Sequence, residues 1–222
     1  MDNTGLAPEV IDISLPISST MPLWPGDPRP QLTPVATLEV EGVQVSQLVL
    51  GTHTGTHVDA PRHFIPGGRT IDQLDLNTLV GECRVVEVIN AAGPLSWTDL
   101  QDLDVRPGER LLLKTRNSQQ PAGPTFTTDF VALDPSGADY LCDQGVRVVG
   151  IDGPSIDAWD ASDFPSHKRL LGADILIVEN LVLRHVVPGT YALIAVPLNL
   201  IGADGCPIRA VLVPCQYPPA VV

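Results

Sequence analysis

Three of the five histidines in this chain of 222 residues fall within residues 53–64, and an aspartate lies among them. The four side chains are His53, His57, Asp59 and His63. Imidazole and carboxylate groups are the usual ligands of zinc, iron and manganese in proteins. A polar loop whose histidines cap backbone groups is the alternative, and it explains one histidine more easily than three histidines with an aspartate. The residue types therefore favour a metal site.

The spacing of these side chains requires a bent backbone. On a helix, His53 and His57 would share a face while Asp59 would point away. On a straight strand they would share a face, but six extended steps separate His53 from Asp59, roughly 20 Å. Metal–ligand bonds are only about 2 Å long. We therefore expect a strand that ends near Thr52 and a tight loop that bends at Gly55, which lacks a Cβ.

Two further candidate ligands lie far along the chain. Residues 175–178 predict a buried strand, and Glu179 stands at its end. A carboxylate in such a place needs hydrogen bonds or a cation. His167 precedes the short turn that leads into this strand, so the two side chains can return to the same end. From the residues alone, a surface histidine and a glutamate bonded to backbone amides explain these positions better, and His185 is expected to be peripheral.

An aromatic loop and two aspartates complete the set of candidates. Residues 21–28 predict a rigid loop, because prolines restrict the backbone on both sides of Trp24. The loop could hold the indole over a pocket or plug the edge of the core, and the residues alone do not separate these roles. Asp152 and Asp157 follow a predicted strand, where functional groups often collect in parallel sheets. We favour a turn-forming role for both.

The hydrophobic pattern predicts alternating strands and helices. Strands are expected at residues 10–15, 43–50, 83–89, 110–115, 146–151, 175–178, 191–198 and 208–213, and helices at 96–103 and 134–145. The strand, helix and strand within 110–151 form a parallel crossover unit. No internal repeat or clear linker is present. We therefore expect one α/β domain with a mixed sheet over residues 1–222, with its core at about 10–213.

Charge and cysteine usage limit the classes of partner. The formal net charge is −13 and the pI about 4.5, which disfavours binding to nucleic acid or to an anionic membrane. The four cysteines form no CxxC pair, which fits a reduced compartment. The first residues lack the basic and apolar parts of a signal peptide. A cytoplasmic protein with a small-molecule substrate is expected.

The motif His53-x-Gly55-Thr56-His57-x-Asp59-x-Pro61-x-His63 resembles the signature of the cyclase-like metal-dependent hydrolase family. The best-known members of this family are bacterial kynurenine formamidases (arylformamidases), and isatin hydrolases and some lactone hydrolases are relatives. The similarity runs from about residue 10 to residue 212. It includes the Trp24-Pro25-Gly26-Asp27 loop, the Gly150-Ile151-Asp152 strand end and the spacing of His167 and Glu179.

The resemblance implies a site for one or two divalent metal ions, zinc or manganese. A first ion would be bound by His53, His57 and Asp59. A second ion would share Asp59 and add His167 and Glu179. These ligand assignments, including the second position, are expectations that come from the resemblance.

The resemblance also implies the surroundings of the metal site. His63 would be the acid/base group, and Trp24 would line the substrate pocket. The family fold is a compact β/β/α arrangement of the swivelling type, usually found as homodimers or larger oligomers. Many relatives carry a second histidine directly after the ligand at position 167, where this chain has Lys168. That departure bears on the second metal position and on proton transfer near it.

The ligand cluster and the resemblance together predict hydrolysis of a small amide. The expected substrate is N-formylkynurenine, which would give kynurenine and formate in tryptophan degradation. A divalent metal lowers the pKa of bound water from about 15.7 toward about 7, and His63 could carry a proton to the leaving nitrogen. A related hydrolase that acts on isatin, a lactone or another cyclic amide is the first alternative. A non-catalytic metal-binding module is the second.

Overall fold

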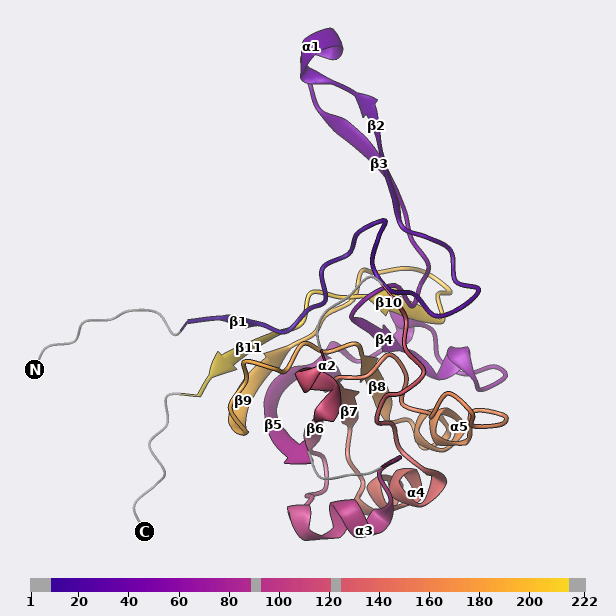
Figure 1. The fold of residues 1–222 in the computed structure, drawn as a ribbon, viewed down its shortest axis with the longest axis vertical. Coiled ribbons are helices and arrows are strands. Elements are labelled where there is room, and N and C mark those ends of the chain that lie inside the picture. Colours follow the sequence, from indigo (N-terminus) through magenta and orange to yellow (C-terminus); the bar gives the residue numbers. More distant parts are fainter. Residues whose placement is uncertain (1–8, 89–92, 121–124, 216–222) are drawn as a thin grey trace, which may run out of the picture.

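A large mixed sheet forms the body of the protein. The computed structural model describes residues 9–88, 93–120 and 125–215. In this part of the chain the sheet has nine strands in the order β1-β11-β9-β5-β6-β7-β8-β4-β10 (Figure 1). Their bounds, in that order, are Ile11–Asp12, Val211–Pro214, Gly189–Ile194, Val80–Val88, Arg110–Thr115, Val148–Ile151, Leu176–Glu179, His57–Asp59 and Gly205–Pro207. The prediction of an α/β fold with a mixed sheet is confirmed.

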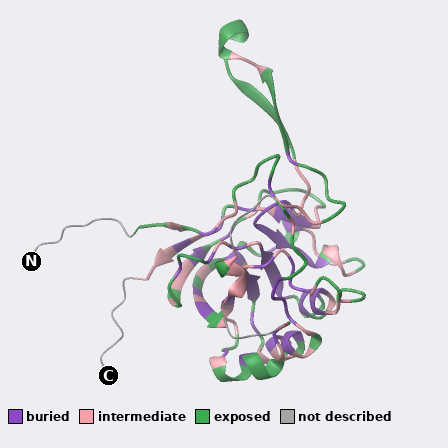
Figure 2. Cartoon of the chain, in the orientation of Figure 1, coloured by how far each residue is buried: buried purple, intermediate pink, exposed green. Residues whose placement is uncertain are grey.

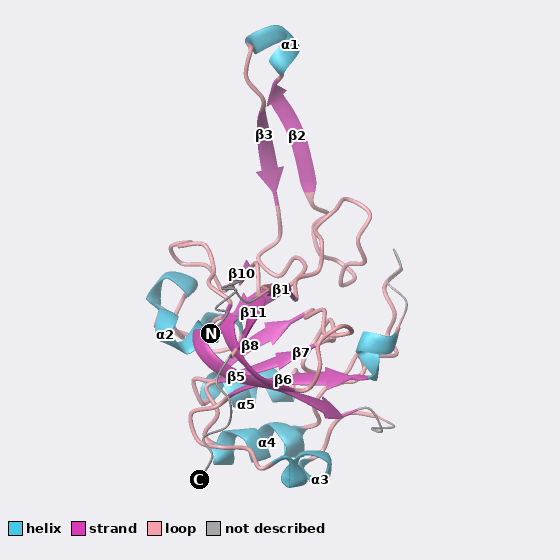
Figure 3. Cartoon of the chain, turned by 90° about the vertical axis from the view of Figure 1, so that its left-hand side faces the viewer, coloured by secondary structure: helices cyan, strands magenta, loops and turns pink. Residues whose placement is uncertain are grey.

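The centre of the sheet is parallel. Strands β5, β6, β7 and β8 run in the same direction, and helices α3 (Trp97–Leu100), α4 (Pro135–Gln144) and α5 (Pro165–Gly172) connect them on one side of the sheet (Figure 3). The predicted crossover from β6 through α4 to β7 is confirmed. Helix α4 begins where the Asp134 side chain accepts a hydrogen bond from Gly137 N, at 2.9 Å. It ends at Gly145, whose φ is +69°.

Apolar side chains cover both faces of the parallel strands. One cluster of buried residues packs between the sheet and the helices and includes Leu113, Leu141 and Leu170. A second cluster on the other face includes Leu112, Val178 and Leu193. Strands β7 and β8 are buried along their whole length (Figure 2), which is typical of parallel strands with both faces covered. The carboxyl end of β8 is therefore a rigid platform.

Strand β4 carries the central part of the histidine motif to this platform. It pairs antiparallel with β8, which sets His57 opposite Glu179. On its other edge it pairs with β10, which sets Asp59 opposite Gly205. The expectation of a ligand loop was wrong here, because His57–Asp59 is a strand held on both edges. The preceding strand ends at Val49, before the predicted Thr52, and the predicted bend at Gly55 is confirmed by its φ of +67°.

An arm projects from the body. Strands β2 (Gln31–Ala36) and β3 (Val45–Val49) form a separate two-stranded sheet, with helix α1 (Leu38–Glu41) at its tip (Figures 1 and 3). Residues 31–35 and 38–49 are all exposed. The sequence predicted the second of these strands, as the strand that leads into the histidine motif, but it predicted neither β2 nor α1. Pro34 within β2 obscures the strand pattern.

The other predicted elements are present with shifted ends. Strand β1 is shorter than the predicted 10–15, and the helix predicted at 96–103 is α3 followed by a 3-10 turn at Gln101–Leu103. A short helix α2 (Leu76–Leu79) precedes β5, and residue 89, the predicted end of that strand, lies outside the described residues. Among the helices of the described residues, none has the length and hydropathy to cross a membrane.

Candidate metal centre and its pocket

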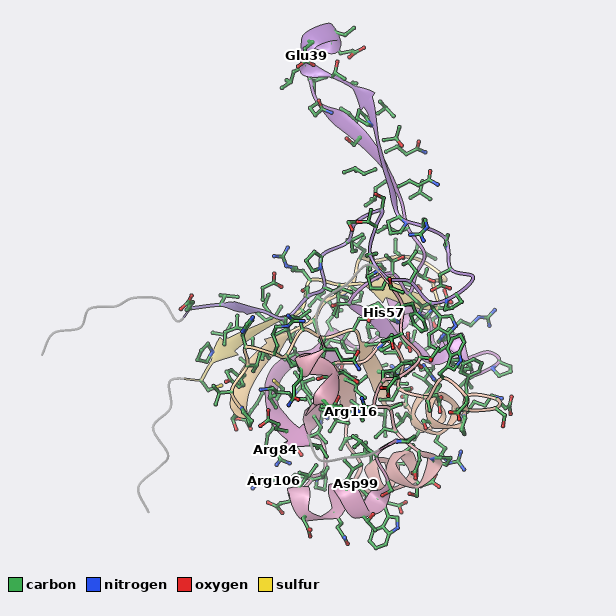
Figure 4. The ribbon with its side chains drawn as sticks, viewed as in Figure 1. Glu39, His57, Arg84, Asp99, Arg106 and Arg116 are labelled. Atoms are coloured by element: carbon green, nitrogen blue, oxygen red, sulfur yellow. The ribbon has the colours of Figure 1, made fainter. Side chains whose placement is uncertain are left out.

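Five side chains from four parts of the chain meet at the carboxyl end of β8. His53 lies in the turn that follows the arm, His57 and Asp59 on β4, His167 on helix α5, and Glu179 at the end of β8. All except His53 are buried. Figure 4 labels His57 within the body, below the base of the arm. The structure thus brings the five residues of the sequence-based ligand set together.

Asp59 is at the centre of this cluster. Its Oδ1 lies 2.8 Å from His53 Nδ1 and 3.3 Å from His57 Nε2, and its Oδ2 lies 3.5 Å from His167 Nε2. Glu179 spans the other side, with Oε2 3.3 Å from His57 Nε2 and Oε1 3.1 Å from His167 Nε2. Glu179 Oε1 also accepts a hydrogen bond from Ile156 N at 2.7 Å. Glu179 therefore also bonds to a backbone amide, as the alternative interpretation of this position expected.

The cluster has the chemistry of a cation site. His57 Nε2 and Asp59 Oδ2 are fully buried and have no hydrogen-bond partner, an arrangement that is costly unless something else binds them. His53, His57 and Asp59 can each offer one ligand atom within 4.8 Å of the others. Mixed nitrogen and oxygen donors suit zinc or manganese. The residues present therefore fit a divalent metal.

The electrostatics of the cluster also favour positive charge. Burial lowers the pKa of His57, but its contacts with Asp59 and Glu179 outweigh burial and raise that pKa to about 10. Burial raises the pKa of Asp59, yet contacts with His167, His53 and His57 hold it well below the usual value for a carboxyl group. Without a metal, protons on the imidazoles supply the charge that the carboxylates require. A metal ion would take their place.

Each imidazole of the cluster also has a polar contact at its other ring nitrogen, on the side away from the cluster. His57 Nδ1 donates to the carbonyl of Gly55 at 2.8 Å. His53 Nε2 lies 3.1 Å from Asp204 Oδ2, and His167 Nδ1 lies 2.7 Å from Asp157 Oδ2. One ring nitrogen of each histidine is thereby occupied, and the other faces the cluster. Such outer contacts fix the tautomer and the orientation of ligand histidines.

Sequence reasoning missed two of these outer acceptors. The turn role favoured for Asp157 was wrong, because its buried carboxylate contacts helix α5 and His167. Asp152 does not serve its own turn either, and its carboxylate accepts hydrogen bonds from Thr115 and Ser118. Asp204 was not among the candidates that the sequence singled out. No local pattern marks it, because pairing of β10 with β4 brings it to the site.

His63 lies beside the cluster and faces the cavity. It ends the 3-10 turn Pro61–His63, and its ring stacks on that of His53 with the centroids 3.9 Å apart. Its Nδ1 lies 3.7 Å from Asp204 Oδ2. Burial is the main reason that the pKa of His63 lies below its usual value. A neutral imidazole at this place can accept a proton.

A cavity of about 340 Å³ opens above the cluster. Its floor is formed by the histidines and Glu179, and its walls are largely aromatic: Trp24, Phe64, Phe126 and Phe164. Trp24 meets Phe126 edge to face, with centroids 5.4 Å apart. Phe64 and Phe164 form a second pair, with centroids 5.2 Å apart. Trp24 thus lies at the pocket as expected, whereas the sequence did not identify the three phenylalanines.

Two residues singled out from the sequence lie outside the cluster. His185 is exposed. Lys168 follows His167 on α5, but its ammonium group pairs with the exposed Asp163. The Lys168 ammonium group is therefore paired with a surface carboxylate and not with a residue of the cluster.

Comparison with known proteins gives the same picture. The family described as putative cyclase matches residues 11–158. A kynurenine formamidase from Salinibacter ruber is 41% identical over 205 residues, which are 91% of this chain and 96% of that protein. The solved structure of a predicted metal-dependent hydrolase from Bacillus stearothermophilus has a TM-score of 0.83 and 34% identity, and the match covers 93% of this chain and 98% of that one.

A more distant solved structure shares the fold alone. Isatin hydrolase A from Labrenzia aggregata, bound to benzyl benzoate, has a TM-score of 0.82 at 20% identity, and the match covers 92% of this chain and 93% of that one. The family expected from the histidine motif is confirmed by the family match and by the close relative. This chain belongs to the cyclase family.

Proposed function

We propose that this protein is a metal-dependent arylformamidase that hydrolyses N-formylkynurenine to kynurenine and formate in tryptophan degradation. The observation that carries the proposal is a cluster of buried imidazoles and carboxylates on the floor of a cavity with aromatic walls. A kynurenine formamidase aligned over nearly the whole of both chains supports the same activity. The protein is a hydrolase that acts on an amide bond.

The metal would be held by the residues of the cluster. His53, His57 and Asp59 form the first position, and Asp59 with His167 and Glu179 forms the second. Zinc or manganese suits these donors. A bound divalent cation would supply Lewis acidity toward the formyl carbonyl and would lower the pKa of a coordinated water.

The side chains around the cluster would bind and orient the substrate. The pair Trp24 and Phe126 and the pair Phe64 and Phe164 line the cavity and offer faces and edges against which an anilide ring can pack. Their apolar surface excludes water from the reacting bond. The ring held between these walls would place its formamide group over the floor of the cavity.

His63 would handle the proton. It lines the cavity next to His53, and burial keeps its pKa low enough for the neutral form at pH 7. Neutral Nε2 or Nδ1 can accept a proton from the attacking water and return it to the departing nitrogen, which leaves as a neutral amine. Asp204 lies near enough to His63 Nδ1 to steady the ring.

Isatin hydrolysis is the main competing function, because isatin is also an aromatic amide and an isatin hydrolase shares this fold. The test is a steady-state comparison of the metal-loaded protein on N-formylkynurenine and isatin. We expect kcat/KM to be higher for the formamide by at least about 100-fold, an energy difference of about 2.7 kcal/mol. The reverse preference would select the isatin reaction. Turnover of neither substrate would favour a binding module.

Replacement of His53 by alanine should remove bound metal. The loss of one imidazole leaves too few donors in the first position, so metal content and activity should fall together, activity by at least about 100-fold. Metal content is measured by inductively coupled plasma analysis of the purified protein. His185→Ala is the matched control, because that histidine is exposed and outside the cluster. Normal metal content in His53→Ala would contradict the ligand assignment.

Replacement of His63 by glutamine should separate metal binding from turnover. The variant should keep its metal, since His63 is not among the proposed ligands, and should lose about 10²- to 10⁴-fold in kcat with the proton carrier gone. Metal analysis and steady-state kinetics on the same preparation measure both. Full activity would exclude His63 from the acid/base role. Loss of the metal instead would make it a ligand, which its position within 4.8 Å of Asp59 and His167 atoms allows.

We also propose that the protein is a cytoplasmic homodimer. The four cysteines are free thiols, which fits a reducing compartment. The arm exposes Leu32 and Leu48, a cross-strand pair with exposed fractions of 70% and 58%, and an isolated hairpin is marginally stable in water. The body has an apolar surface of its own at Leu198 and Ile201. A second copy could cover both surfaces and bury these exposed leucines and Ile201, which would favour association.

Charge on the arm should therefore weaken the dimer. Leu48→Lys would place an ammonium group in the apolar contact, and we expect a shift from dimer toward monomer in light scattering after gel filtration. Leu76→Lys is the control, since Leu76 is an exposed leucine on helix α2. A dimer of unchanged stability in Leu48→Lys, or equal dissociation in both variants, would reject the arm as the interface.

A further inference from the structure

Asp157 is a buried carboxylate directly behind the metal centre. It lies six residues after the end of β7, and its exposed fraction is 1%. Its Oδ1 accepts a hydrogen bond from Ser166 N at 2.8 Å. Its Oδ2 accepts one from His167 N at 3.0 Å and lies 2.7 Å from His167 Nδ1. Each bond reaches the first turn of helix α5, so one side chain fixes both the backbone and the ring of His167.

These contacts leave one arrangement of the His167 ring. Asp157 Oδ1 already accepts from Ser166 N and Oδ2 from His167 N, and a carboxylate that accepts at both oxygens has no proton to give to the ring. Nδ1 must therefore carry the proton that Oδ2 accepts. Nε2 is then the nitrogen that faces Glu179 and Asp59, at 3.1 and 3.5 Å.

We propose that Asp157 is a positioning residue: it holds His167 as the Nδ1-protonated tautomer, with Nε2 directed at the divalent cation. This inference rests on the metal ligation proposed above. It concerns the second metal position, where Asp59, His167 and Glu179 meet. Asp157 touches neither the cation nor the substrate in this arrangement and acts only through His167. Carboxylate–histidine–metal triads of this kind are common around zinc, and loss of the outer partner typically costs 10- to 100-fold in affinity.

Asparagine cannot replace Asp157. The two carboxylate oxygens face N–H groups on both sides, so the amide NH₂ of asparagine would meet a donor in either orientation. With NH₂ toward Ser166, a buried N–H loses its acceptor. With NH₂ toward His167, it would donate to Nδ1 and drive the ring proton onto Nε2, where it blocks the metal. Asp157→Asn is therefore nearly isosteric, but it removes the negative charge behind His167, and it either leaves a buried N–H unpaired or reverses the hydrogen bond to Nδ1.

Asp152 provides a matched control. It stands five residues earlier, and its carboxylate accepts hydrogen bonds from Thr115 N at 2.8 Å and from Ser118 N at 3.0 Å. It fixes the segment that follows β6, as Asp157 fixes the start of α5. It contacts none of the site histidines among its described hydrogen bonds. Asp152→Asn removes the same charge from the same part of the chain without an effect on His167.

The experiment compares the full-length wild-type protein, Asp157→Asn and Asp152→Asn. Zinc affinity is measured by competition with a chromophoric chelator, and thermal unfolding of the metal-free proteins reports their folding. We expect zinc at the His167 position to bind about 10- to 100-fold more weakly in Asp157→Asn, with less than about a twofold change in Asp152→Asn. Unchanged affinity in Asp157→Asn, or equal losses in both variants, would overturn the proposal.

A second measurement needs only a protein that folds. Long-range ¹H–¹⁵N spectra of the zinc-loaded wild type, with the His167 signals assigned by their absence in His167→Gln, report the tautomer directly. We expect a protonated Nδ1 and a zinc-shifted Nε2. A protonated Nε2, or no response of His167 to zinc, would refute the assignment. Neither the zinc affinity nor the tautomer depends on turnover. Zinc binding with the expected tautomer but no hydrolysis of formamides would reject the proposed function and leave the role of Asp157 intact.

Discussion

The structure of the site depends on the burial of two carboxylates beside three imidazoles. Asp59 is inaccessible to solvent and Glu179 nearly so, and a buried carboxylate without compensation is strongly destabilising. The imidazoles supply that compensation only if each presents the correct nitrogen. The cluster is therefore stable with protons or with a cation between its members, and the orphaned atoms His57 Nε2 and Asp59 Oδ2 show that hydrogen bonds alone do not complete it.

A short strand positions these imidazoles and carboxylates relative to one another. Strand β4 has three residues, yet it pairs on both edges, with β8 and with β10. The β8 pairing sets His57 beside Glu179, and the β10 pairing brings Asp204 against His53. Gly205 is required at this contact, because a Cβ there would lie 2.5 Å from the His53 ring. The same pairings that hold the backbone thus determine the side-chain geometry of the candidate metal centre.

The sequence predicted the site residues that lie close together in the chain. It did not predict those that only the pairing of distant segments brings to the site. The histidine motif is compact enough to indicate a metal, and the apolar runs of β6 to β8 indicate buried strands. His167 and Glu179 required the family resemblance, since each alone resembles an ordinary surface or strand-end residue. Asp157 was misjudged, because nothing in its neighbourhood shows that it will face a helix beginning eight residues later. The first strand and the tip helix of the arm, β2 and α1, were not predicted, because their residues are largely exposed and so show no pattern of buried and exposed positions.

The floor and the walls of the cavity come from different kinds of structural element. The residues that would carry out the reaction are therefore separate from those that would select the substrate ring. Most of the floor consists of side chains on β4, β8 and α5, which are packed into the body of the protein, and His53 and His63 complete it from two turns. The aromatic walls come from loops: Trp24 lies before the arm, Phe126 follows β6, and Phe164 precedes α5 in a left-handed conformation with φ of +49°. Changes in the loops can alter the ring that fits without disturbing the cation site.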